Sequence, residues 1–161
     1  RRLDAAQTGA ATLDVYHKCG HIAAGDVAQT FGLQGDTTFL NMTMHINNSQ
    51  TFNFFLANGH KLVIGEGMNF TVNKANCYFT LAGGMYDYND RTASTDITVR
   101  SGKWRTIYAG GYRASVIGLA KADISDVWVY NNIAVTYCGN IGEAKMTISN
   151  AEPVRHLRRL H

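Results

Sequence analysis

Short segments of the chain alternate apolar and polar residues with a period of two. In Asp96–Val99 and in Lys145–Ile148, every second residue is apolar. This period is typical of β-strands that bury one face, and β-branched and aromatic residues are common in these segments. Only the short tail 154–160 approaches the spacing of an amphipathic helix. The pattern therefore predicts an all-β protein.

Two sets of similar segments recur at nearly regular intervals. The first set is aligned on Leu56, Leu81, Tyr108 and Tyr137, and the interval grows only slightly along the chain. The second set consists of Asp96–Val99, Asp123–Asp126 and Lys145–Ile148. Asp96 and Asp123 are therefore expected at equivalent positions of consecutive repeats. Self-similarity of this kind indicates a solenoid, in which each repeat covers the apolar face of the next.

Sixteen glycines and a single proline fit a chain with many tight corners. Two or three strands of about five residues, with their turns, add up to a coil of about 25 to 30 residues. We therefore expect a right-handed parallel β-helix (solenoid) of about five coils with irregular caps at both ends. The handedness follows the general rule for parallel crossover connections. A small antiparallel β-sandwich with an accidental period is the alternative fold.

The expected organisation has three parts. Residues 1–35 form an N-terminal cap or an irregular first coil, 36–150 form the coils of the β-helix, and 151–161 form a basic C-terminal tail or cap. The chain begins with two arginines and no methionine, so we expect a mature or excised piece of a longer precursor.

One long repeat carries a resemblance to a known family. In the run 95–111, TDITVRSGKWRTIYAGG, a strand leads through Ser-Gly-Lys-Trp to a second strand and a glycine pair. This run resembles the Ser-Gly-x-aromatic/Gly-Gly repeats of bacterial β-helical cell-surface proteins of the adhesin-like kind. Residues 57–65, ANGHKLVIG, resemble a rung found near the start of such solenoids. The resemblance covers about residues 36–150.

The resemblance implies a scaffold. We expect a non-enzymatic structural or adhesin-like module that is secreted or displayed at the cell surface. The open ends of the stack present unpaired strands, so the expected partners are further copies of the chain, end to end or side by side, or neighbouring coils of a larger parent protein. Glycans are candidate ligands.

Charge and motifs exclude several functions. The net charge is +3, and much of the excess lies in arginines near the two ends, which argues against a nucleic-acid groove. No apolar run approaches the roughly 18 residues that span a bilayer. The chain has no P-loop, dinucleotide-binding glycine motif or nucleophile elbow. No cofactor and no catalytic residue are predicted.

Aromatic residues are the most suggestive candidate site. Exposed aromatic faces in a row would suit sugar rings, whereas aromatics stacked inside the coil would be core. The candidate glycan-binding residues are Tyr86, Tyr88, Trp104, Tyr112 and Trp128.

The runner-up function is a carbohydrate-active β-helix or a carbohydrate-binding module. A polysaccharide lyase or a glycoside hydrolase would need carboxylates from adjacent coils along one groove, and Asp96 and Asp123 are the candidates. Aspartates that open strands more often bind the local backbone at turns.

Cysteines, histidines and asparagines leave further questions open. His17, Cys19 and His21 have ligand types that suit zinc, but they lack a second cluster, so no metal site is predicted. Cys19, Cys77 and Cys138 allow at most one internal disulfide. Asn41, Asn47 and Asn69 lie in glycosylation sequons.

Overall fold

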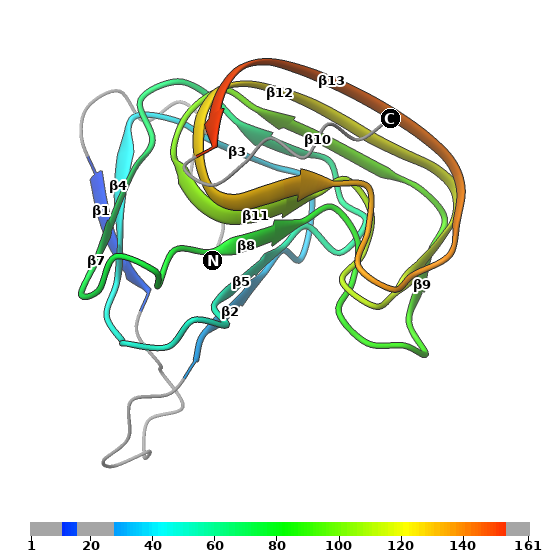
Figure 1. Cartoon of the computed structure of the whole chain (residues 1–161), viewed down its shortest axis with the longest axis horizontal. Helices are drawn as coiled ribbons and strands as arrows, with labels where there is room; N and C mark the ends of the chain where they lie inside the picture. The colour runs from blue at the N-terminus through cyan, green and yellow to red at the C-terminus, as the bar shows by residue number, and fades with distance from the viewer. Residues whose placement is uncertain (1–10, 16–27, 154–161) are drawn as a thin grey trace.

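A computed structural model of the chain describes residues 11–15 and 28–153, which contain thirteen strands and no helix (Figure 1). The strands are β1 (Ala11–Val15), β2 (Thr30–Gly32), β3 (Thr37–Phe39), β4 (Met42–Ile46), β5 (Phe54–Leu56), β6 (Leu62–Ile64), β7 (Asn69–Val72), β8 (Thr80–Ala82), β9 (Arg91–Thr92), β10 (Thr95–Val99), β11 (Lys103–Tyr108), β12 (Ser115–Ala134) and β13 (Ile141–Pro153).

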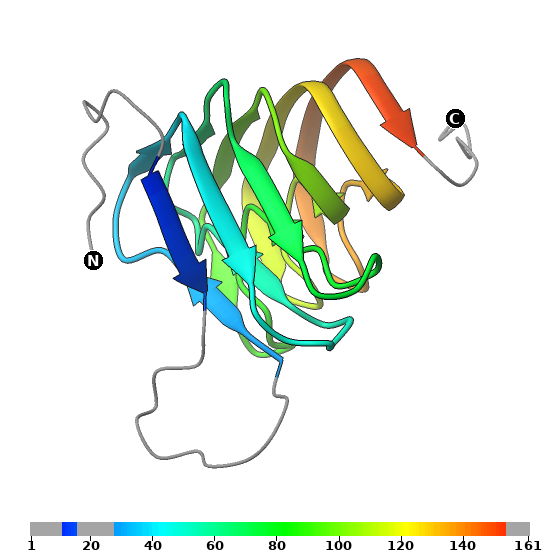
Figure 2. The same cartoon turned by 90° about the vertical axis from the view of Figure 1, so that its left-hand side faces the viewer.

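All strand pairings in these residues are parallel, which excludes the antiparallel sandwich. One side of the stack consists of β1, β4 and β7. A second side runs through β2, β5, β8, β11 and the end of β12, and a third through β3, β6, β10, β12 and β13. Figure 2 shows the coils side by side in chain order. The predicted parallel β-helix of about five coils is confirmed.

The register of the second side is more regular than the sequence alignment. Leu56, Ala82, Tyr108 and Ala134 lie opposite one another, so the step from coil to coil is constant. The alignment of Leu81 with Leu56 and Tyr108 is wrong by one residue, and that of Tyr137 with Tyr108 is wrong by three, because Tyr137 pairs with Tyr112. Leu81 instead lies between Phe55 and Ile107 and faces the core. A one-residue slip would have turned each apolar side chain to the opposite face of the sheet.

Strand pairing on the third side shows that a second predicted alignment, that of Asp96 with Asp123, is wrong. Asp96 lies opposite Lys121, whereas Asp123 lies opposite Thr98. The predicted equivalence of Asp96 and Asp123 is therefore wrong by two residues. An error of two residues preserves the alternation of inward and outward side chains, so the hydrophobic pattern alone could not detect it.

The core is the column of side chains inside the coils. It combines aromatic and aliphatic side chains: Phe55 packs edge-to-face on Phe39, Phe79 and Trp104. The side chains of Ile97, Ile107 and Ile124 are also fully buried. Edge-to-face contacts let large rings fill the wide coils without voids.

Parts of the two predicted caps belong to regular coils of the stack. β1 and β2 pair with β4 and β5 and so belong to the first coil of the stack, and β13 extends the last coil to Pro153. The rest of the predicted caps, in 1–10, 16–27 and 154–161, lies outside the described residues. The histidines and the cysteine of the candidate zinc cluster, at 17, 19 and 21, also lie there.

Close packing between coils predicts a specific effect of one methyl group. A Cβ atom on Gly83 would overlap the backbone carbonyl oxygen of Ala109 in the next coil. Gly83→Ala should therefore lower the free energy of unfolding by about 1 to 3 kcal/mol. The same substitution at Gly35, where a Cβ would meet no atom within 4 Å, should change it by less than about 0.5 kcal/mol. Urea unfolding of both variants measures the difference, and equal effects would contradict the predicted close packing.

Candidate functional site

The corner between the second and third sides grows after the second coil. In the second coil, the short segment 57–61 connects Leu56 on β5 to Leu62 on β6. The equivalent connection in the next coil, from Ala82 to Ile97, is the longer segment 83–96, and the one after it, from Tyr108 to Ala122, is 109–121. The extra residues include β9 and the start of β12, which pair with each other, and the loop 85–90 between β8 and β9. This enlarged corner carries most of the predicted aromatic site.

Three tyrosines form a ladder along this corner. Tyr86, Tyr112 and Tyr137 recur at nearly the same interval as the strands of the second side. The rings of Tyr86 and Tyr112 stack with centroids 5.5 Å apart, and those of Tyr112 and Tyr137 stack at 5.0 Å. The backbones of Tyr112 and Tyr137 also pair in a parallel bridge. The ladder therefore follows the axis of the solenoid, one ring per coil.

The ladder covers a second, smaller apolar cluster on the outside of the second side. This cluster consists of Phe54, Leu56, Ala82 and Tyr108. The Phe54 ring lies 4.8 Å from that of Tyr112 and 4.9 Å from that of Tyr86, measured between centroids. Burial, with a smaller contribution from Tyr112 and Tyr137, raises the pKa of Tyr108 to about 12. Tyr86 and Tyr112 of the ladder therefore pack on this apolar cluster and contribute to the stability of the fold.

Arg113 occupies an unusual position beside the ladder. The carbon of its guanidinium group lies 5.3 Å from the centroid of the Tyr88 ring and 5.4 Å from that of Tyr112. Its backbone is left-handed, with φ at 66°, and its amide donates a 2.6 Å hydrogen bond to the Tyr137 carbonyl. Left-handed backbone is uncommon for a residue with a long side chain.

The structure brings together three of the five predicted aromatic residues. Tyr86, Tyr88 and Tyr112 lie in one cluster at the corner. The sequence prediction missed Tyr137 and Arg113. The interval from Tyr86 to Tyr112, repeated once more along the chain, is the signal that could have found Tyr137. No spacing rule points to Arg113, because its role depends on how two loops meet.

Trp104 is fully buried, so its predicted part in glycan binding is wrong. In β11 the side chain of Lys103 points outward, and the alternation of the strand turns Trp104 into the core. There its ring packs on Phe70 and its indole nitrogen donates to the Ser101 carbonyl. The sequence did not indicate which alternate residues of this strand face the core.

Trp128 lies apart from the corner, in a separate group. Its ring contacts that of Tyr78 at 5.3 Å between centroids, and the Lys103 ammonium lies 5.9 Å from its centroid. It lines a shallow polar groove where β7 and β11 belong to different sheets and do not pair. The five predicted residues therefore do not form one site.

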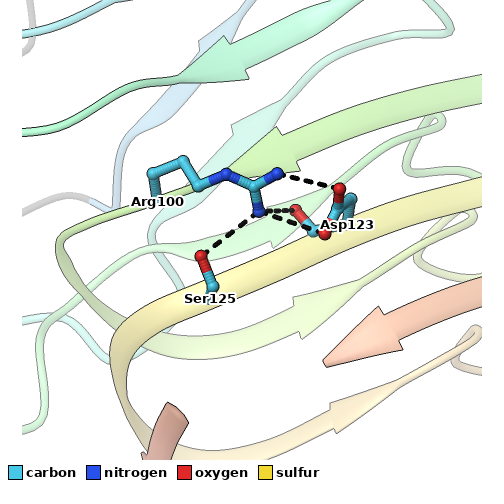
Figure 3. A network of polar contacts seen from close by, with 3 residues as sticks. All are labelled: Arg100, Asp123 and Ser125. Atoms are coloured by element: carbon cyan, nitrogen blue, oxygen red, sulfur yellow. Dashed lines mark hydrogen bonds and ion pairs between the residues drawn. The ribbon is translucent and has the colours of Figure 1, made fainter. Parts of the chain in front are cut away.

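Arg100 and Asp123 form a two-pronged ion pair across the third side (Figure 3). The two guanidinium nitrogens of Arg100 donate to the Asp123 carboxylate at 2.8 and 3.0 Å, and one of them also donates to Ser125. The hydrogen bond from Arg100 lowers the pKa of Asp123, and the same contact raises the pKa of Arg100. Asp123 thus neutralises an arginine rather than pairing with the Asp96 carboxylate. Residues 28–151, whose side chains are described, hold no group of three or more histidine, cysteine or acidic residues that could bind a metal.

The C-terminal end of the stack is open among the described residues. Ala144, Met146 and Ile148 of β13 face inward opposite Ala120, Ala122 and Ile124. The three residues on β12 are buried, whereas the Ile148 side chain is 46% exposed. No described strand pairs with the outer edge of β13. At the N-terminal end, by contrast, Leu33 and Phe39 are buried.

The remaining candidates are scattered. Cys77 is buried and Cys138 is exposed, and Cys19 lies outside the described residues. The three sequon asparagines, Asn41, Asn47 and Asn69, are exposed beside or on β4 and β7.

Comparison of the chain with protein-family models, curated proteins and solved structures gives no match. Among the described residues, no helix is long and apolar enough to cross a membrane.

The raised pKa of Tyr108 predicts a loss of stability at alkaline pH. Because the folded chain keeps this phenol protonated up to about pH 12 and the unfolded chain does so only up to about pH 10, stability should fall as the pH rises above 10. The loss from this group should be on the order of 1 kcal/mol at pH 11. Tyr108→Phe, which keeps the ring, should flatten the fall in urea unfolding between pH 9 and 11 (roughly the titration range of tyrosine). An equally steep fall in the variant would contradict the assignment.

The ion pair on the third side predicts the opposite dependence at acid pH. The pKa of Asp123 is lower in the folded chain, so its stabilisation is complete above about pH 4 and disappears as the pH falls through the folded value. Asp123→Asn should cost about 0.2 to 1 kcal/mol at pH 7, because the pair is partly exposed, and progressively less as the pH falls below about 4, the usual aspartate pKa. Glu66→Gln on an exposed turn is the control. A cost that persists unchanged at low pH would contradict the role of the charge.

Proposed function

We propose that this chain is a non-enzymatic structural module, a β-solenoid scaffold whose C-terminal end joins a second copy. The observation that supports this function is the open end. The row Ala144, Met146 and Ile148 is apolar, faces the axis and is uncovered at the last described coil. Its equivalents one coil earlier are completely covered. One more layer would bury this row in the same way.

The edge of β13 supports the same conclusion. This strand is 13 residues long, and its outer edge offers backbone N–H and C=O groups that no described strand uses. Long unpaired edges are templates for pairing with another chain. Tyr137, the last ring of the ladder, is also exposed at this end and stacks on Tyr112 through one face. Backbone, core and ladder thus all end uncovered at the same coil.

Two copies fit best with their C-terminal ends together. Leu33 and Phe39 of the first described coil are buried, whereas Ile148 of the last is 46% exposed, so the C-terminal end leaves its inward-facing apolar row less covered. A two-fold axis pairs β13 with β13 of the second copy in antiparallel fashion. Because each copy then uses its C-terminal edge for the other, the assembly closes as a dimer and does not extend into a filament.

We assign the module to an extracellular or cell-surface setting. The support is the resemblance of the 95–111 repeat to bacterial adhesin-like solenoids, together with a fold in which consecutive coils form one continuous parallel stack. Such stacks are stiff, and their variable corners display side chains at the surface. Here the long corner displays the tyrosine ladder.

The dimer is tested by light scattering coupled to size-exclusion chromatography over a range of protein concentrations. The wild-type chain should dimerise as concentration rises, and Ile148→Asp should remain a monomer because it places a charge in the uncovered apolar row. Ile117→Asp is the matched control: Ile117 is 67% exposed on β12, away from the end, and its substitution should leave the dimer intact.

Circular dichroism of each variant establishes that the fold is retained. A wild-type chain that is monomeric at every concentration, or an Ile148→Asp variant that dimerises as well as Ile117→Asp, would overturn the proposal.

A further inference from the structure

Arg113 is a cation that is fixed in place and has no carboxylate beside it. The ion pairs among residues 28–151, whose side chains are described, are Arg100–Asp123 and His60–Asp36, and Arg113 belongs to neither. The Nε atom of Arg113 is buried and has no hydrogen-bond partner. The charge of Arg113 is therefore not neutralised by a carboxylate of residues 28–151. A ligand that carries a negative charge would supply the counter-ion through the outer guanidinium nitrogens.

The residues around Arg113 restrict the orientation of its guanidinium group. Tyr88 and Tyr112 flank the guanidinium group through their ring faces, and the backbone is held in the left-handed region by the hydrogen bond to Tyr137. A planar guanidinium whose orientation is set in advance loses little freedom when it binds a carboxylate through two parallel hydrogen bonds. The arrangement favours a planar carboxylate over a neutral group.

The rest of the corner offers aromatic surface next to this cation. Tyr88 is 60% exposed and Tyr86 is 42% exposed. A sugar ring has an apolar face that packs well on such flat amphipathic surfaces. Asp87 lies next to Tyr88, and its carboxylate accepts a 2.7 Å hydrogen bond from the Tyr88 amide. With Asp87 and Asp90 in the same loop, the corner suits isolated negative charges on a sugar chain rather than a dense polyanion.

We propose that this corner is a binding site for an acidic polysaccharide that contains uronate residues. The carboxylate of one uronate accepts hydrogen bonds from the Arg113 guanidinium, and a sugar ring packs on the exposed face of Tyr88. This site is lateral and does not use the open end of the solenoid. The inference therefore goes beyond the proposed assembly function and does not rest on it.

The experiment compares two ligands that differ only in the carboxylate. Isothermal titration measures binding of a cello-oligosaccharide oxidised to glucuronate at C6, and of the unoxidised cello-oligosaccharide of the same length. The glucuronate oligomer should bind at least roughly tenfold more tightly, because the charge-assisted hydrogen bonds are lost with the neutral ligand. Equal affinities for the two oligomers, or no binding of either, would overturn the proposal.

The variants separate the site from a general effect of charge. Arg113→Gln should weaken binding of the glucuronate oligomer about tenfold or more, and Tyr88→Ala should weaken it several-fold. Lys61→Gln removes the same charge at an exposed position on another coil and should leave the affinity unchanged. An equal loss in Lys61→Gln and Arg113→Gln would show that only net charge matters and would overturn the proposal.

Two further measurements keep the test interpretable. Arg113→Lys keeps the charge without the planar fork, so it should bind more weakly than wild type even where Arg113→Gln fails to fold. Titration of the Ile148→Asp variant should give the wild-type affinity, because the lateral corner is complete in a single chain. The glycan site and the dimer can thus each fail without the other.

Discussion

Backbone hydrogen bonds between parallel strands hold each coil of this solenoid on the next. On the second side they keep a constant step from coil to coil, from Leu56 through Ala82 and Tyr108 to Ala134. Because the register is fixed, the inward-facing side chains of successive coils lie above one another and form one continuous core column. The ladder of tyrosines and the outer apolar cluster beneath it follow from the same register.

The candidate site depends on a change in the path of the coil. The corner between the second and third sides lengthens in the third coil, and in the fourth coil β11 pairs with β8 but not with β7. The added loop supplies Tyr86 and Tyr88, and the next corner supplies Tyr112 and Arg113. Where β7 and β11 no longer pair, a shallow groove remains beside Trp128. The parallel pairing of the second side is thus the same from coil to coil, while the length of the corner beside it changes.

The repeat pattern was sufficient to predict the fold but not the register. Glycine pairs and alternating strands indicated a parallel solenoid, yet the alignment placed Leu81 one residue and Asp123 two residues away from their true partners. Leu81 and Ala82 are both apolar, and Lys121 and Asp123 are both charged, so the hydrophobic pattern fits either alignment and only the backbone pairing distinguishes them. The same limit explains Trp104, because the sequence does not show which residues of β11 face inward.

The aromatic corner could be predicted in part: Tyr86, Tyr88 and Tyr112 lie near glycine-rich corners, whereas Arg113 depends on the meeting of two loops and on a left-handed backbone. The sequence predicted open strand edges at the ends of the stack but not which apolar row stays uncovered, since Ile148 has the same pattern as the buried Ile124.

The most direct measurement is amide hydrogen exchange along β13 at increasing protein concentration. If the last coil pairs with a second copy, amides on the outer edge of Ile141–Pro153 should become protected as concentration rises, while those of β12 remain protected throughout. Rapid exchange of the outer-edge amides of β13 at every concentration would show that this edge stays unpaired, and would contradict the joining of two copies through their C-terminal ends.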